Sequence, residues 1–398
     1  MSKVKIPLSS QKELAPELAF SRERVKTPHY GRYLEDFEPG QVFRHPRGMT
    51  INPGLARAFA TSFHQMNPLY LNREYAQAHG FKDMPVSPQL VFNLVLSLGV
   101  QNDSEKAIAN LGYYDAQFLR PVYANDTIRA LTRVVDRRFR GDPSEGKPGI
   151  VHVQTMGLNQ DDRPVLQYER KIMVAPRGER PATVPAPAGE IAFPWVEEPV
   201  ARVPRLKEGR AYPTDLTGEH SYFEDFEAGE IILHANGRTV TSEHQWWTYW
   251  VGNTHPLHYD RVYSMGLSGA MSGEPIAYGG LVFAWLEGLA SRDLSENAVW
   301  ELGFTEGYHT QPTVTGDTVA ALSRILALEE GPEGLDVGVV TVQFIGVKNI
   351  SAAAALDTYG EDLFIKETAK RGLGKDKIGA KIFEIERKLL IKKRPSAS

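Results

Sequence analysis

Residues 33–51 read YLEDFEPGQVFRHPRGMTI, and residues 222–240 read YFEDFEAGEIILHANGRTV. The two stretches align without a gap and share nine identical residues. The correspondence continues in two further blocks, which pair NPLY (67–70) with HPLH (255–258) and LGYYDAQFLRPVYANDT (111–127) with LGFTEGYHTQPTVTGDT (302–318). Three blocks in the same order indicate a tandem duplication, whose period is too long for a solenoid.

The duplication divides the chain into four segments. The stretch between the halves, APRGERPATVPAPAGEIAFPWVEEPVARVP (175–204), is typical of an extended linker, because proline stiffens the backbone and removes hydrogen-bond donors. We therefore expect an N-terminal arm (1–30), a first domain (31–175), a linker (176–213) and a second domain (214–398).

Each half shows the same order of hydrophobic periodicities. An apolar helix is predicted at 87–100 in the first half and at 280–291 in the second, because apolar residues recur there at helical spacing. Alternating apolar and polar residues further along each half predict antiparallel strands. One long helix combined with several strands predicts an α+β fold in each half, with a sheet wrapped around the helix.

The second half departs from the first near its end. Residues 350–375 are alanine-rich, have no counterpart in the first half and predict a helical insertion. In the strand that follows, Phe383 and Ile385 are expected on one face, with Glu384 and Glu386 on the other.

Composition limits the possible functions. The net charge is −4 with a pI of about 6.3, so we expect no nucleic-acid partner. The chain has no cysteine, which excludes disulfides, thiolate nucleophiles and cysteine-ligated metals. No apolar run reaches the ~18 residues that cross a bilayer, and the first residues lack an apolar signal core. We expect a cytoplasmic protein without a membrane partner.

Two short motifs resemble the MaoC-like (R)-specific enoyl-CoA hydratases, whose domains have the hot-dog fold. That family carries D-x-N-P-x-H, and the second half reads NTHPLH at 253–258, where the first half reads QMNPLY at 65–70. The family enters its central helix with an A-H-G-M-L-type sequence, and the second half reads AYGGL at 277–281. The stretch FLRPVYANDT (118–127) also resembles a family signature. The resemblance implies two tandem hot-dog domains that form a pseudo-dimer, with the substrate in the cleft between them.

Within that family the chain is most similar to the mesaconyl-CoA hydratases, also called β-methylmalyl-CoA dehydratases. The similarity covers residues 90–123, Asn253 with Thr254 and His258, and the run 278–280. The Asp of the wider motif is Asn253 here, and its Asn is His255. The resemblance implies reversible hydration of a 2-enoyl-CoA, with coenzyme A entering only as part of the substrate and with no other cofactor.

Hydration of an enoyl thioester needs a positioned water, a proton donor and acceptor, and stabilisation of the thioester oxygen. His258 suits the proton transfer, because the ordinary pKa of histidine is ~6.5. Asn253 can hold the water but cannot act as a base. Gly279 opens the predicted helix, where a free N–H can bind the developing oxyanion. These three residues are the predicted catalytic set.

Three further residues are predicted to bind the substrate: His255, Tyr278 and Gly280. His255 could instead be a second titrating group or a packed turn residue. The first half carries Tyr70 and Pro88 where the second half has His258 and Gly279, so we expect one active site per chain. No histidine spacing indicates a metal site.

Other interpretations stay open from sequence alone. A hot-dog thioesterase would use a helix carboxylate, for which Glu287 is the candidate, and a non-catalytic acyl-CoA-binding protein is also possible. A dicarboxylic substrate needs a cation for its free carboxylate, and Arg73, Arg238, Arg261 and Arg292 are equal candidates. We expect an acyl-CoA substrate and a homo-oligomer of pseudo-dimeric chains.

Overall fold

The computed structural model of the chain describes residues 20–28, 30–142, 145–179, 191–205, 216–218 and 220–395. Most of the predicted arm (1–30) and two parts of the predicted linker (176–213) therefore lie outside the described residues.

The described part of the chain forms one antiparallel sheet of eleven strands. Its order is β1-β4-β5-β6-β3-β8-β11-β10-β9-β7, with β2 paired to β4 beside this path. The strands of the first half are β1 (Val42–Arg44), β2 (Met49–Thr50), β3 (Ala107–Phe118), β4 (Thr127–Arg138), β5 (Gly149–Leu158) and β6 (Pro164–Val174). Those of the second half are β7 (Ile231–Thr239), β8 (Ala298–His309), β9 (Thr318–Glu330), β10 (Val337–Lys348) and β11 (Lys381–Lys392).

The pairing of β3 with β8 joins the two halves at the centre of the sheet. Tyr113 lies opposite Gly307, and Ala116 lies opposite Phe304. In the repeat alignment Tyr113 corresponds to Phe304, and Ala116 corresponds to Gly307. Each strand therefore meets the other at equivalent positions, and the sheet order reads the same outward from β3 as from β8. This arrangement is a local twofold axis, as expected for a fused pair of like domains.

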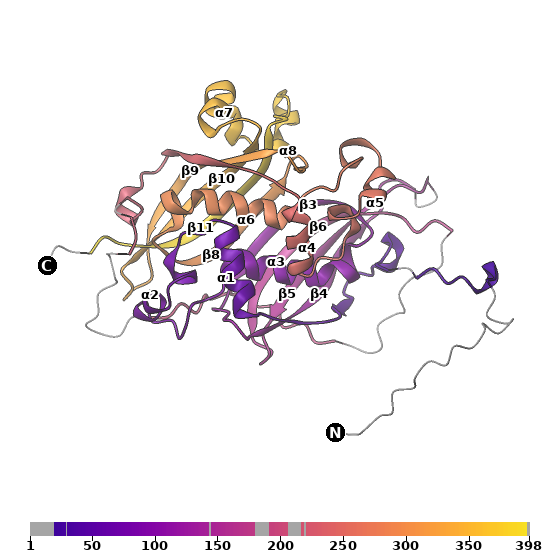
Figure 1. The fold of residues 1–398 in the computed structure, drawn as a ribbon, viewed down its shortest axis with the longest axis horizontal. Coiled ribbons are helices and arrows are strands. Elements are labelled where there is room, and N and C mark those ends of the chain that lie inside the picture. The colour runs from indigo at the N-terminus through magenta and orange to yellow at the C-terminus, as the bar shows by residue number, and fades with distance from the viewer. Residues whose placement is uncertain are drawn as a thin grey trace, which may run out of the picture.

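Two apolar helices, α3 (Pro88–Gly99) and α6 (Gly279–Ala290), lie next to each other across one face of the sheet (Figure 1). Helix α3 begins after Ser87, whose side chain accepts from the Leu90 N–H, and it has proline in its first turn. Nearly every residue of both helices is buried, and side chains from both halves form one continuous core. The predicted plan of a helix wrapped by antiparallel strands is observed in both halves.

Shorter helices complete the described fold. They are α1 (Pro53–Ser62), α2 (Arg73–Ala78), α4 (Glu243–Trp250), α5 (Arg261–Met265), α7 (Ala352–Tyr359) and α8 (Glu367–Lys370). Helices α1 and α4 occupy matching places in the two halves. No helix within the described ranges is long and apolar enough to cross a membrane.

The predicted helical insertion is observed between β10 and β11, where α7 and α8 stand apart from α3 and α6 (Figure 1). It changes the environment of β11, because it covers the face of that strand on which Glu384 lies. Glu384 is buried there and pairs with Lys381 at 2.6 Å. The predicted alternation along β11 is observed, because Phe383 and Ile385 lie in the main core and Glu384 lies on the side of the insertion, where it accepts from the Glu367 N–H at 3.0 Å.

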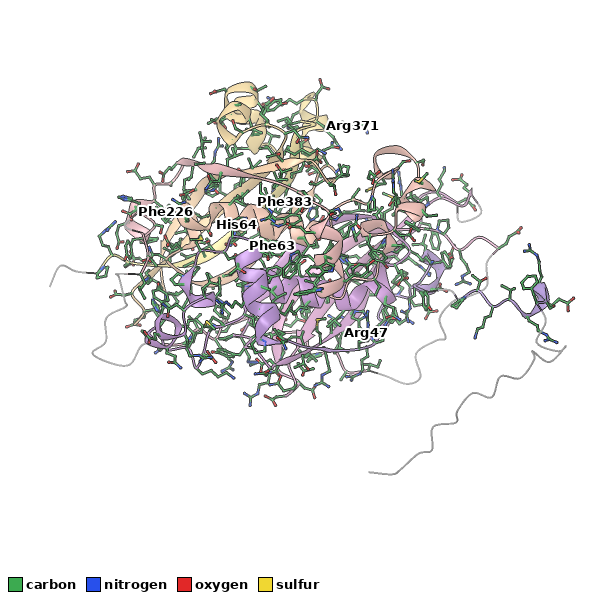
Figure 2. All side chains as sticks on the ribbon, viewed as in Figure 1. Arg47, Phe63, His64, Phe226, Arg371 and Phe383 are labelled. Carbon is green, nitrogen blue, oxygen red and sulfur yellow. The ribbon has the colours of Figure 1, made fainter. Side chains whose placement is uncertain are left out.

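The two halves approach each other closely at Gly288 of α6. A Cβ atom built there would lie 1.6 Å from the backbone oxygen of Phe63, the residue that ends α1 (Figure 2). The rings of Phe63 and Trp285 are stacked beside this contact, with centroids 5.2 Å apart. Only glycine allows the α1 backbone to approach α6 this closely.

We expect Gly288→Ala to lower the free energy of unfolding by ~1–3 kcal/mol, because the new methyl group must push α1 away from α6. Denaturant unfolding would measure the loss. Gly372→Ala is the control, since nothing lies within 4 Å of its Cβ position, and it should change stability little. Equal stability of the two variants would contradict close contact at this point.

Candidate active site

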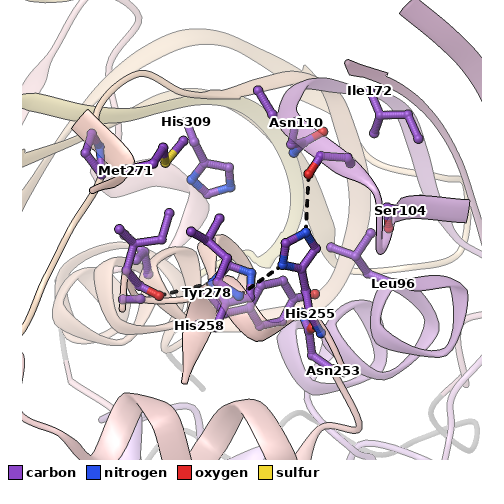
Figure 3. Close-up of a pocket in the computed structure, with 18 of the residues that line it drawn as sticks. Leu96, Ser104, Asn110, Ile172, Asn253, His255, His258, Met271, Tyr278 and His309 are labelled. Atoms are coloured by element: carbon purple, nitrogen blue, oxygen red, sulfur yellow. Dashed lines mark hydrogen bonds between the residues drawn. The ribbon is translucent and has the colours of Figure 1, made fainter. Parts of the chain in front are cut away.

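A cavity of about 220 Å³ lies between the two halves (Figure 3). The second half contributes the turn around His258, the start of α6 and the end of β8. The first half contributes the end of α3, the start of β3 and part of β6. Polar lining residues are Ser104, Asn110, Tyr113, Arg170, Asn253, His255, His258, Tyr278, His309, Thr310, Gln311 and Thr313. Five of the six predicted site residues line this one cavity.

His258 ends a short 3₁₀ turn, η8 (Pro256–His258), which begins with proline. Its Nδ1 lies 3.0 Å from the Ile276 carbonyl oxygen, which can only accept, so Nδ1 carries the proton. Burial lowers the pKa of His258 to about 3, with a further lowering from neighbouring His255. The ring is therefore neutral, and its Nε2 has no hydrogen-bond partner among the described residues. Nε2 is a proton acceptor beside the cavity.

His255 differs from His258 because both of its ring nitrogens are occupied. Its Nδ1 accepts from the Leu257 N–H at 3.1 Å, and its Nε2 donates to the Ala107 carbonyl at 3.2 Å. Burial lowers its pKa to about 4. His255 ties the turn to β3 of the other half and lines the cavity as a neutral ring. No ring nitrogen remains for proton transfer with a substrate.

Asn253 is buried at the start of the same turn. Its Oδ1 accepts from the His255 N–H at 2.8 Å, which fixes the orientation of the amide. The amide Nδ2 then remains as the group available to the cavity, and it can only donate. Asn253 can therefore hold a water or hydroxyl by donating from Nδ2 to the oxygen of that molecule. The sequence reasoning had instead expected the side-chain carbonyl to accept from the water.

Gly279 is the first residue of α6, and its N–H has no acceptor in the described part of the chain. Tyr278, which precedes it, makes no side-chain cap. The helix start therefore offers an unpaired donor to the cavity. A Cβ on Gly279 would lie 2.5 Å from Nε2 of His309, so glycine is needed for this ring to pack on the helix.

Gly280 is the one predicted residue that does not line the cavity. Its carbonyl accepts from Nδ2 of Asn93 on α3 at 3.0 Å, and a Cβ there would meet the Asn93 side chain. Gly280 therefore serves the crossing of α3 and α6. Tyr278 does line the cavity, with its ring centroid 5.3 Å from that of His258. Burial holds the pKa of Tyr278 well above its ordinary value, so its hydroxyl stays protonated.

Two cavity residues were missed by the sequence reasoning, His309 and Arg170. His309 ends β8, and its Nε2 lies 3.4 Å from the Tyr113 hydroxyl of the other half. A signal was present in the aligned blocks, since His309 corresponds to Phe118. A histidine that replaces phenylalanine at a core position indicates an altered environment.

Arg170 is the arginine that lines the cavity, and none of the four arginines considered from sequence does so. Arg73 pairs with Asp83 and Arg261 pairs with Glu274, both at 2.8 Å. Arg238 pairs with Glu243. Arg170 is buried on β6 and donates from Nη2 to Asp103 at 2.8 Å.

The equivalent cleft of the first half is nearly filled, with a cavity of about 20 Å³. Tyr70 and Pro88 line it where His258 and Gly279 line the larger cavity. Trp300 of β8 also lines it, at the position that corresponds to Ala109 on β3. Larger side chains therefore occupy the space that would receive a substrate.

Glu287, the carboxylate considered for a thioesterase, does not line the larger cavity. Its oxygens accept from Ser295 at 2.8 Å and from Gln65 at 3.3 Å, and Oε1 lies 3.5 Å from Nη2 of Arg387. The carboxylate is buried beside Arg387 and does not face the larger cavity.

Across the described residues no group of three or more potential metal ligands is found.

Comparison with known proteins agrees with this geometry. A family model for mesaconyl-CoA hydratase matches residues 15–192. The β-methylmalyl-CoA dehydratase of Chloroflexus aurantiacus is 32% identical over 80% of this chain and 89% of its own length. The mesaconyl-CoA hydratase of Cereibacter sphaeroides is 32% identical over 80% of this chain and 90% of its own length.

Solved structures agree as well. A MaoC domain protein dehydratase from Chloroflexus aurantiacus superposes with a TM-score of 0.76 at 28% identity, covering 92% of this chain and 98% of that one. A Mycobacterium tuberculosis protein described as a double hot-dog fold superposes with a TM-score of 0.66 at 20% identity, covering 90% and 98%. The predicted tandem hot-dog fold is confirmed. The chain belongs to the mesaconyl-CoA hydratase family of MaoC-like proteins. The prediction of a hydro-lyase is confirmed at the level of this family.

The neutral histidines make stability depend on pH. The pKa of His258 is lowered to about 3 and those of five others to about 4, mainly by burial: His45, His79, His244, His255 and His309. Unfolding restores pKa values near 6.5, so the unfolded chain binds more protons below that pH. The stability that depends on these neutral rings is fully present above pH 6.5 and is lost as pH falls toward 4.

We expect the melting temperature to be nearly constant from pH 7 to 8 and to fall steeply below pH 6.5. Each histidine contributes up to ~1.4 kcal/mol per pH unit in that window. Thermal unfolding between pH 5 and 8 measures the effect. His309→Phe, which installs the residue of the first half, should reduce the slope by about one proton. A melting temperature that rises on acidification would refute the assignment of neutral rings.

Proposed function

We propose that the chain reversibly hydrates mesaconyl-CoA, or a similar short branched 2-enoyl-CoA, at His258, Asn253 and Gly279. The observation that carries the proposal is the free Nε2 of His258, which lies with an unpaired helix N–H in a cavity shared by both halves. The names of the relatives at 32% identity support the choice of substrate.

Hydration begins with a water held between His258 and Asn253. The Asn253 Nδ2 donates to the water oxygen, and the water donates to Nε2 of His258. As the oxygen attacks the β-carbon, Nε2 takes the proton, and negative charge moves to the thioester oxygen. The Gly279 N–H at the start of α6 stabilises that charge, a contribution of ~3 kcal/mol for one such donor.

The same imidazole then completes the reaction. Nδ1 is bound to the Ile276 carbonyl, and His255 has no free nitrogen, so the proton on Nε2 is the one nearest the reaction centre. A low pKa makes the transient imidazolium a strong acid, which favours transfer to the α-carbon. His258 thus takes the proton from water and delivers it to the α-carbon. The reaction therefore needs no second acid–base group, and Asn253 can stand where the wider motif has Asp. Dehydration is the reverse, with Asn253 donating to the departing hydroxyl.

The proposal needs water and the substrate's own coenzyme A, and no further cofactor. Assembly into a homo-oligomer and a cytoplasmic location stay predictions.

We expect His258→Gln to lower kcat by ~10²–10⁴-fold, the usual contribution of a general acid–base group, with little change in folding. The assay follows the absorbance of the conjugated double bond of mesaconyl-CoA. Tyr70→Phe is the matched control, because Tyr70 occupies the equivalent position in the nearly filled cleft, and it should retain activity.

Two outcomes would contradict the assignment. One is near-normal hydration by folded His258→Gln protein, and the other is an equal loss from Tyr70→Phe. A thiol reagent run in parallel reports release of free coenzyme A, which would indicate a thioesterase instead.

A second pair of variants tests Asn253. Asn253→Asp keeps an acceptor for the His255 N–H and installs the residue of the wider motif. Its carboxylate loses the Nδ2 donor but can hold the water by accepting from it, so we expect substantial activity. Asn253→Ala removes both that acceptor and the donor to water, and we expect a loss of at least ~10-fold, since a hydrogen bond to a reacting group is worth more than ~1 kcal/mol. Measured kcat values that rank Ala above Asp would show that Asn253 does not hold the water.

A further inference from the structure

We propose that Arg170 binds a free carboxylate on the acyl group of the substrate and so selects dicarboxylic acyl-CoA thioesters. The inference rests on the proposed function for its reaction, and it adds the residue that distinguishes a dicarboxylic from a monocarboxylic acyl chain. It arises from a comparison of two arginines that the local twofold axis relates.

Arg170 and Arg387 are equivalent by strand register. Arg170 on β6 lies opposite Tyr113 on β3, and Arg387 on β11 lies opposite Phe304 on β8. Tyr113 and Phe304 are themselves equivalent in the repeat. Both arginines are buried, at 4% and 1% exposure. The two halves therefore place a guanidinium group at the same point of the fold.

In the second half, carboxylates of the chain itself neutralise Arg387. Its Nε donates to one oxygen of Glu301 on β8 at 3.3 Å, and its Nη2 donates to the other. Glu287 on α6 lies 3.5 Å from the same Nη2. A carboxylate thus holds the guanidinium group in a two-point contact, the geometry in which arginine binds carboxylates most specifically. The adjoining cleft is the nearly filled one.

The first half lacks both of these carboxylates. Asn110 on β3 stands at the position of Glu301, and Leu96 on α3 stands at the position of Glu287. Within the described ranges, Arg170 donates side-chain hydrogen bonds to Asp103 and Ser104, both from Nη2. Its Nε is buried without a partner in the described part of the chain. Asn110, Leu96 and Arg170 all line the larger cavity, so the missing carboxylate would lie inside it.

The charges around Asp103 also leave a positive excess. Arg32 is buried in the same region and interacts electrostatically with Asp103, so two guanidinium groups share that carboxylate. The next carboxylate, Asp36, is paired with Arg177. Around Arg387 the balance is reversed, with two carboxylates for one guanidinium group. A buried charge without a partner is costly, so the cavity favours an anionic ligand.

A substrate carboxylate supplies the missing partner. Mesaconate is an unsaturated dicarboxylate, so its monothioester keeps one free carboxylate beyond the double bond. With the thioester oxygen at Gly279 and the double bond beside His258, that carboxylate would take at Arg170 the place that Glu301 takes at Arg387.

Binding of two unreactive ligands tests this without turnover. Succinyl-CoA and butyryl-CoA have the same four-carbon acyl chain and differ in a terminal carboxylate or methyl group. We expect the wild-type protein to bind succinyl-CoA at least ~30-fold more tightly in calorimetry, as for a buried charge pair. Asn110→Glu recreates the Glu301 contact and should abolish the preference. Asn110→Gln has the same length without charge and should keep it.

The outcomes separate the two proposals. No preference in the wild type, or an equal loss in Asn110→Glu and Asn110→Gln, overturns the role of Arg170. If Asn110→Glu does not fold, Asn110→Asp replaces it, and the wild-type protein is then the uncharged control because Asn is isosteric with Asp. If Asn110→Asp still prefers succinyl-CoA, the inference is also overturned. A wild-type preference for succinyl-CoA without hydration of mesaconyl-CoA would support the carboxylate site and refute the proposed function.

Discussion

The pairing of β3 with β8 is the contact on which the rest of the structure depends. It joins two five-stranded halves into one sheet, with β2 beside it, and sets a local twofold axis at their junction. That axis brings α3 and α6 together and gives both clefts the same surrounding elements. Each cleft is built from both halves, so neither half could form the cavity alone. A difference between the clefts must then come from side chains, because the backbones correspond.

The side-chain differences are consistent with one cleft having become part of the core. Tyr70, Phe118 and Trp300 fill the first-half cleft, and aromatic rings there bury apolar surface that a ligand would otherwise cover. Glu301 and Glu287 meanwhile neutralise Arg387 from within the chain. Burial, with a smaller contribution from the neighbouring Glu287 carboxylate, raises the pKa of Glu301 to about 7 against the opposing effect of Arg387. The other cleft keeps its volume and keeps its arginine incompletely paired.

The sequence could predict much of this because duplication makes comparison possible within one chain. The repeat identified two like domains, and the resemblance to the MaoC-like family implied the hot-dog fold. The contrasts of His258 with Tyr70 and of Gly279 with Pro88 indicated which half holds the site. Arg170 was missed because the insertion between β10 and β11 breaks the offset, so its counterpart Arg387 is not found by counting residues. Strand register, which only the structure supplies, makes the two equivalent.

The proposed substrate brings negative charge to both Arg170 and His258. Burial holds His258 neutral, with smaller lowering contributions to its pKa from His255, His244 and His309. Arg170 lines the same cavity and is incompletely paired. On the proposed assignment, a substrate carboxylate neutralises Arg170 as it binds. The developing negative charge on the thioester oxygen then stabilises the imidazolium that forms. A dicarboxylic substrate therefore leaves fewer buried charges unpaired in the transition state than an uncharged acyl chain, which would leave Arg170 without its second partner.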